Sequence, residues 1–247
     1  MKIKFLVIIG LLCSIGAFGI ELSANYQESA PKYFKESGVV QGICYDYILA
    51  LNKELEADNI KINNKNPSSP FVPWARMLSN LENGTTDIIV GAAISAAREE
   101  KYTYIKEPLY EVQSTFAKKK DFDFDFDGES SLSGMKINYV NGSKTGKYVA
   151  GLNDVIGEPV NSLEIALKKL NAGRCDLVYY HSLGLGYNIK KLNFDNLDVT
   201  KSGVKTYYHY IALNKNTPAK TVKAIEAALL RLKEKGEDIK IMEKYLN

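Results

Sequence analysis

A hydroxyl and a guanidinium lie three residues apart, at Ser95 and Arg98, directly after a run of small residues. The planar fork of an Arg side chain matches a carboxylate in two parallel hydrogen bonds, and Ser95 adds a hydroxyl and an amide donor. Residues 91–93, Gly-Ala-Ala, lie just before this pair and carry no bulky side chain, so a ligand can approach their backbone closely. This pattern predicts a carboxylate-binding corner; the alternative is a strand end followed by a solvent-exposed helix start.

A second donor-rich segment follows a predicted strand at residues 135–140. A glycine turn and then hydroxyls, at Ser143 and Thr145, open a predicted helix whose N-terminus suits an anion. The segment is too short for the G-x-x-x-x-G-K spacing of a nucleotide-binding loop. The simpler alternative, which can coexist with anion binding, is that Ser143 only caps the helix.

Apolar periodicity predicts the elements that position these groups. Residues 86–93 predict a buried strand that ends just before the carboxylate-binding corner. Residues 73–82 predict a short helix that Trp74 opens. Trp74 contacts a ligand or, in the simpler alternative, packs in the core with its N–H satisfied. Residues 175–180 predict another buried strand, which leads to His181.

Several segments are similar, in their order and spacing, to one known family. They are G-I-C-Y-D-Y at 42–47, W-A-R-M-L at 74–78, L-E-N-G-T-T-D-I-I at 81–89 and S-A-A-R at 95–98, with Y-T-Y-I-K-E-P-L-Y at 102–110. They resemble the bacterial extracellular solute-binding proteins of family 3, the polar amino-acid receptors of ABC importers. The resemblance covers nearly the whole chain after its N-terminal segment. It implies an α/β fold, the two-lobed type II periplasmic binding protein fold, with two crossing strands and a ligand cleft between the lobes.

The resemblance also implies roles for the candidate residues. Ser95 and Arg98 would bind the ligand carboxylate from one lobe, and Ser143 and Thr145 would donate to it from the other. In this family an aromatic residue near the start of the first loop often covers the ligand, and Tyr26 is the candidate here. The alternative for Tyr26 is a partly buried surface tyrosine.

His181 departs from the family pattern, which usually has an Asp there that pairs with the ligand ammonium. An uncharged imidazole cannot pair with an ammonium as a carboxylate does. The departure favours a ligand that has no free α-amino group or whose amine is held in another way. If His181 meets a second acidic group, affinity should rise as the pH falls from 8 to 6, since an unperturbed His titrates near about 6.5. The alternative is a structural histidine.

The first 19 residues are typical of a secretory signal, with Lys2 and Lys4 before an apolar run. We therefore expect a periplasmic, soluble monomer. The expected organisation is a signal peptide at 1–19, a discontinuous first lobe at 20–112 and 206–247, and a second lobe at 113–205. Cys44 and Cys175 fall in different lobes of this arrangement, so we expect two buried thiols and no disulfide.

Composition and spacing exclude several functions. The formal net charge is +3 over 247 residues with no basic stripe, so nucleic acid is not an expected partner. Asp123, Asp125 and Asp127 imitate the start of a calcium loop, but Gly134 stands where the loop requires a Glu. With only His181 and His209 as histidines and no C-x-x-C, we expect no metal and no cofactor.

Three functions remain open. The leading hypothesis is a receptor that closes on a small carboxylate-bearing solute, an amino acid or a related acid, and delivers it to an ABC permease in the inner membrane. The rival is an enzyme, because cyclohexadienyl dehydratases resemble the same family; Glu28, Asp46 and His181 are its candidate general acids. The third is a sensor that reports the ligand to a membrane partner without transport.

Overall fold

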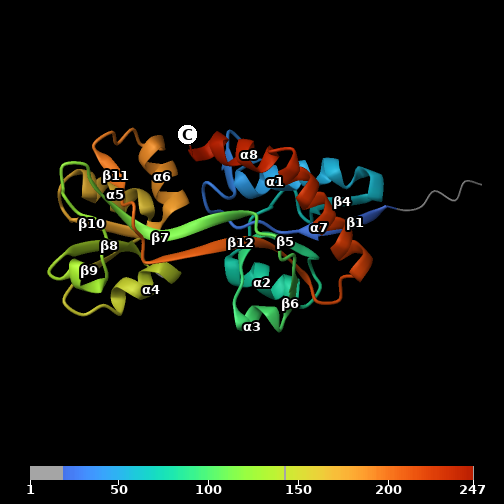
Figure 1. The fold of residues 1–247 in the computed structure, drawn as a ribbon, viewed down its shortest axis with the longest axis horizontal. Coiled ribbons are helices and arrows are strands. Elements are labelled where there is room, and N and C mark those ends of the chain that lie inside the picture. Colours follow the sequence, from blue (N-terminus) through green and yellow to red (C-terminus); the bar gives the residue numbers. More distant parts are fainter. Residues whose placement is uncertain (1–18, 142, 247) are drawn as a thin grey trace, which may run out of the picture.

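Two long strands, β7 (Tyr110–Lys119) and β12 (Lys205–Asn214), pair antiparallel and run through the middle of the molecule (Figure 1). The computed structural model describes residues 19–141 and 143–246, so all of the predicted signal peptide except Gly19 lies outside the described residues. The two strands belong to a mixed ten-stranded sheet in the order β4-β1-β5-β12-β7-β10-β8-β9, with β6 on β12 and β11 on β7. One group of helices and strands surrounds each end of the strand pair, which gives two lobes (Figure 1).

The first lobe is built on the sheet half next to β12. Its strands are β1 (Ile20–Ala24), β4 (Ile60–Asn64), β5 (Ile88–Ala93) and β6 (Tyr102–Tyr104), with a separate hairpin of β2 (Phe34–Glu36) and β3 (Val39–Gln41). Its helices are α1 (Ile43–Glu54), α2 (Trp74–Glu82), α3 (Ala96–Glu99), α7 (Ala219–Glu234) and α8 (Glu237–Leu246), and a 3-10 turn lies at Glu56–Asp58. β1 pairs parallel with both β4 and β5, as expected for strands joined by helices.

Strand β5 shows why this half of the sheet is covered on both faces. Ile88 and Val90 belong to the large core that α1 and α7 cover, whereas Ile89 and Ala92 pack with α2 on the opposite face. Successive strand side chains point to opposite faces, and the shift in pairing with β12 at Gly91 places Ala92 on the face of Ile89. The continuous apolar run therefore buries both faces. The predicted strand at residues 86–93 is therefore confirmed, and its end delivers the carboxylate-binding corner.

The second lobe repeats this layered arrangement beyond β7. Its strands are β8 (Lys136–Val140), β9 (Ile156–Val160), β10 (Leu177–His181) and β11 (Leu197–Val199). Its helices are α4 (Lys144–Ala150), α5 (Leu163–Asn171) and α6 (Ser182–Lys191), and a 3-10 turn lies at Glu129–Leu132. Val178 of β10 faces the core under α5 and α6, and Tyr179 faces the core under α4.

Contacts between the lobes lie along α6, which contacts α8 of the first lobe. The predicted lobe boundaries at residues 112/113 and 205/206 fall in the two long strands and remain a prediction. Cys44 and Cys175 are both free and buried, as expected. Within residues 19–141 and 143–246, no helix is long and apolar enough to cross a membrane.

Candidate functional site

Arg98 is folded back onto the end of β5. Its Nη1 donates to the carbonyl of Ala93 at 2.9 Å, and Tyr104 Oη donates to the same carbonyl at 3.2 Å. The short helix α3 carries Arg98 one turn past the strand, so the side chain can reach back to it. Ala93 thus fixes the guanidinium through its backbone oxygen, and the remaining N–H donors of the fork are left for another acceptor.

Two cations lie near the Trp74 ring. Its half-buried indole opens α2, as predicted, with the Arg98 guanidinium carbon 5.3 Å from the ring centroid. The Lys32 ammonium lies 5.9 Å from the same centroid. Both distances are within the range of a cation–π interaction. The sequence did not predict Lys32 as a site residue, because the loop that carries it has no motif.

Neither of these cations has an acidic partner among the described residues. Lys32 Nζ makes no hydrogen bond and no ion pair there, and Arg98 makes its bond to a neutral carbonyl. The exposed lysines around α3 behave differently, because Lys101 pairs with Glu82 at 2.8 Å and Lys106 with Glu99 at 2.5 Å. The site therefore carries uncompensated positive charge.

His181 caps helix α6 of the second lobe. Its Nδ1 accepts a hydrogen bond from Gly184 N at 3.0 Å, so the neutral ring carries its proton on Nε2. Burial, and then the charge of Lys32, lower the pKa of His181 from 6.5 to about 3. The titration of His181 between pH 8 and 6, on which the predicted rise in affinity rests, is therefore contradicted in the unliganded protein. Nε2–H remains as a donor, which suits an acceptor and not an ammonium.

A buried hydrogen-bonded chain lies behind the site. Cys44 Sγ contacts Tyr110 Oη at 3.0 Å, and the same hydroxyl contacts Nδ1 of His209 at 3.0 Å. Burial lowers the pKa of His209 well below its usual value, and Lys32, His181 and Arg98 lower it further. The two histidines and the two cations therefore lie within electrostatic range of one another, although they come from both lobes.

The predicted serine and threonine donors lie at helix starts. Ser143 Oγ accepts from Gly146 N at 2.8 Å and donates to Val140 O at 2.6 Å, which is the capping role of the simpler alternative. Thr145 Oγ1 contacts Ser143 Oγ at 3.1 Å. Ser95 is exposed at the start of α3, where its side chain makes no capping bond. Their contacts with a ligand remain predictions.

Tyr26 lies deeper than either sequence alternative predicts. It is 3% exposed, in the core of the first lobe, and its ring stacks on Tyr33 at 4.8 Å. Burial raises the pKa of its phenol to about 12. The expectation of a partly buried surface tyrosine is wrong, and its role as a cover for the ligand remains a prediction.

The candidate general acids of the enzyme alternative do not converge. Asp46 accepts from Lys244 Nζ at 2.7 Å and from Tyr245 Oη at 2.9 Å, so it joins α1 to α8. Glu28 is exposed in the first loop. His181 is held neutral as a helix cap. This arrangement does not form an acid–base site.

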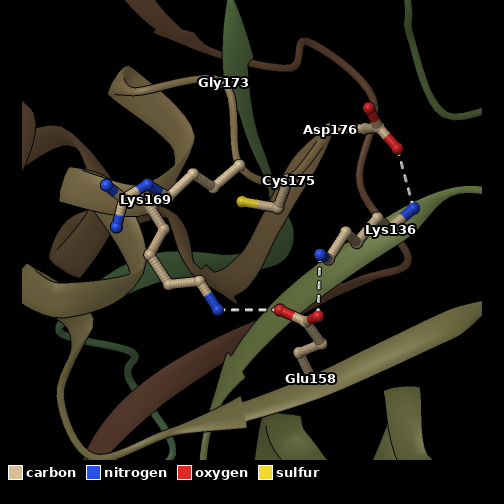
Figure 2. Close-up of a pocket in the computed structure, with 7 residues that line it drawn as sticks. Lys136, Glu158, Lys169, Gly173, Cys175 and Asp176 are labelled. Atoms are coloured by element: carbon tan, nitrogen blue, oxygen red, sulfur yellow. Dashed lines mark hydrogen bonds and ion pairs between the residues drawn. The ribbon is translucent and has the colours of Figure 1, made fainter.

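An open surface hollow of about 540 Å³ lies elsewhere, at the edge of the second lobe (Figure 2). Figure 2 shows Glu158 between Lys136 and Lys169, at 2.8 Å and 2.7 Å. These two ammonium groups lower the pKa of Glu158 to about 2. Glu158 and the two lysines therefore pair with one another, and the hollow includes none of the predicted site residues. Among the described residues, no cluster of His, Cys, Asp and Glu could hold a metal.

Comparisons with known proteins agree with this arrangement. The family model of the bacterial extracellular solute-binding proteins, family 3, matches residues 23–247. A probable histidine-binding protein of Neisseria gonorrhoeae is 27% identical over 228 residues, which are 90% of this chain and 81% of the relative.

Two solved structures share the fold. An ancestral cationic amino acid solute-binding protein superposes with a TM-score of 0.77 at 20% identity, over 93% of this chain and 96% of its own. The second substrate-binding domain of a putative amino acid ABC transporter from Streptococcus pneumoniae gives a TM-score of 0.72 at 21% identity, over 92% of this chain and all of its own.

Proposed function

Because this chain belongs to family 3 of the bacterial extracellular solute-binding proteins, we propose that it captures a small carboxylate-bearing solute between its lobes. Membership in a family of binding proteins favours binding over the dehydratase alternative. One observation carries the proposal. The Arg98 guanidinium is fixed on Ala93 O and lies near Trp74, and no carboxylate of the described residues pairs with it. Such a fork is pre-organised for a ligand carboxylate.

The partners follow from the family and from the names of the relatives. We propose that the protein acts in the periplasm as a monomer and delivers its solute to an ABC permease. The solute is an amino acid or a related acid, and His181 supplies a donor at the site from the second lobe. Ser95, Ser143 and Thr145 remain candidate donors, with Tyr26 as a candidate cover.

Thermal-shift and calorimetric screening of the mature chain tests the proposal. The panel contains neutral, cationic and acidic amino acids together with dicarboxylates and cyclic acids. A ligand at 100 times its Kd should add roughly 2.7 kcal/mol to the free energy of unfolding. Product analysis of each hit separates binding from catalysis: turnover would restore the enzyme alternative, and stabilisation by no carboxylate would contradict the proposal.

A further inference from the structure

The backbone of Lys32 is fixed by two hydrogen bonds. Its carbonyl accepts from Cys44 N at 3.0 Å, and its N–H donates to Ser29 O at 2.8 Å. Gly42 packs so closely on this segment that a Cβ there would collide with the Lys32 carbonyl. The loop is therefore fixed on the start of α1, and the Lys32 ammonium lies 5.9 Å from the Trp74 ring centroid.

Within residues 19–141 and 143–246, no carboxylate pairs with the Lys32 ammonium. The described groups within electrostatic range of Lys32 are a guanidinium, two imidazoles and a thiol, from Arg98, His181, His209 and Cys44. Burial raises the pKa of the Cys44 thiol to about 11, so the thiol is neutral at pH 7. Burial also lowers the pKa of the Lys32 ammonium, and Arg98 lowers it further. A cation that is desolvated beside another cation is stabilised when an anion joins both.

We propose that the ligand carries two acidic groups, one bound by Arg98 and the other by Lys32, both of which lie near the Trp74 ring. The inference rests on the proposed function, because it takes Arg98 as the site of the first carboxylate. It adds the chemical class of the solute, a small molecule with two anionic groups. The similar proteins include a probable histidine-binding protein and a cationic amino acid solute-binding protein, but a cationic ligand would add a third positive charge here.

The test compares acids with their own monoamides, which differ only in the second charge. Calorimetry measures L-glutamate against L-glutamine, L-aspartate against L-asparagine, and succinate against succinamate. A charged hydrogen bond contributes roughly 1.5–3 kcal/mol, so one diacid should bind at least about tenfold tighter than its monoamide. Lys32→Met should remove most of this difference, because it weakens binding of the diacid more than binding of the monoamide. Lys32→Arg should retain the preference.

Matched measurements keep the outcomes distinct. Lys35→Met removes an exposed charge from the same loop and hairpin and should keep the wild-type preference. Unliganded melting curves and circular dichroism verify that each variant folds. If a monoamide, L-histidine or L-arginine binds best, or if Lys32→Met retains the preference, the two-acid inference is overturned while the proposed function stands. If only another carboxylate of the wider panel binds, and it has a single acidic group, the inference is likewise overturned and the proposed function stands. If no carboxylate of that panel binds, both are contradicted.

Discussion

At the scale of single residues, the N–H donors of Arg98 serve two different acceptors. One nitrogen anchors the side chain to Ala93 O, and the rest of the fork faces the proposed carboxylate. Arg98→Ala should weaken binding by roughly two to three orders of magnitude, because loss of one partner of a buried ion pair costs about 3–5 kcal/mol. Arg98→Lys should also lose much of the affinity, since a single ammonium cannot hold Ala93 O and form two parallel bonds to a ligand carboxylate.

Calorimetry with a ligand from the panel measures both variants. Arg76→Ala is the matched control, because Arg76 is exposed on α2, next to the same indole in sequence. It should bind as the wild type does. Near-wild-type affinity in either folded Arg98 variant would remove Arg98 from the site.

His181 predicts how stability depends on pH. Its pKa is about 3 in the folded chain and near 6.5 in the unfolded chain, so between these values the unfolded state binds more protons. Stability should therefore be full above pH 6.5 and fall as the pH is lowered toward 3. This one group contributes up to about 1.4 kcal/mol per pH unit well below 6.5.

His181→Asn isolates this contribution, because Asn also caps a helix N-terminus but does not titrate. Urea denaturation at pH 5, 6, 7 and 8 should show a shallower acid loss in the variant, while His209 still contributes to both proteins. The two curves should run parallel from pH 7 to 8. Equal slopes at every pH would mean that His181 is not held neutral.

At the scale of elements, the backbone conformation and packing of β5 require a glycine at position 91. Gly91 has φ +95°, and a Cβ there would collide with Cys44 Sγ and lie 3.2 Å from Tyr110 Oη. Gly91→Ala should lower the free energy of unfolding by about 2 kcal/mol or more, from backbone strain and overpacking together. Adding Cys44→Ala should relieve the overpacking part alone.

The double-mutant cycle measures this coupling by urea denaturation. Gly38→Ala is a useful reference, because Gly38 also has positive φ but a Cβ added there would meet no atom within 4 Å, which leaves strain without collision. Additive effects of Gly91→Ala and Cys44→Ala would contradict the packing explanation.

Elements with clean periodicity could be predicted from the sequence, and contacts between distant elements could not. Strand β5 is a continuous apolar run, so its burial and its delivery of Arg98 follow from local pattern. Helix α6 was not predicted, because Gly184 and Gly186 interrupt its pattern and His181 is not among the usual capping residues. Lys32 reaches the Trp74 ring only through the folded first loop, and no local signal encodes that approach.

At the scale of the molecule, α6 links the site to the contact between the lobes. His181 caps its first turn, and Tyr187 on the same helix packs on Phe34 of β2 with ring centroids 5.4 Å apart. Leu183 also joins the core of the first lobe. A ligand that binds at His181 would therefore favour the arrangement in which α6 lies against the first lobe, and that arrangement would favour binding.

Tyr187→Ala should weaken binding although Tyr187 is not a proposed ligand contact. An aromatic pair contributes about 0.5–1.5 kcal/mol beyond its buried area, so affinity should fall roughly twofold to tenfold. Leu230→Ala, an exposed position on α7, should leave affinity unchanged.

In small-angle scattering the wild type should contract on saturation with a panel ligand, whereas Tyr187→Ala should need more ligand to reach the same radius. A wild-type radius that stays constant at saturation would argue against lobe closure. Wild-type affinity in Tyr187→Ala would show that the packing of α6 on the first lobe is not coupled to ligand binding.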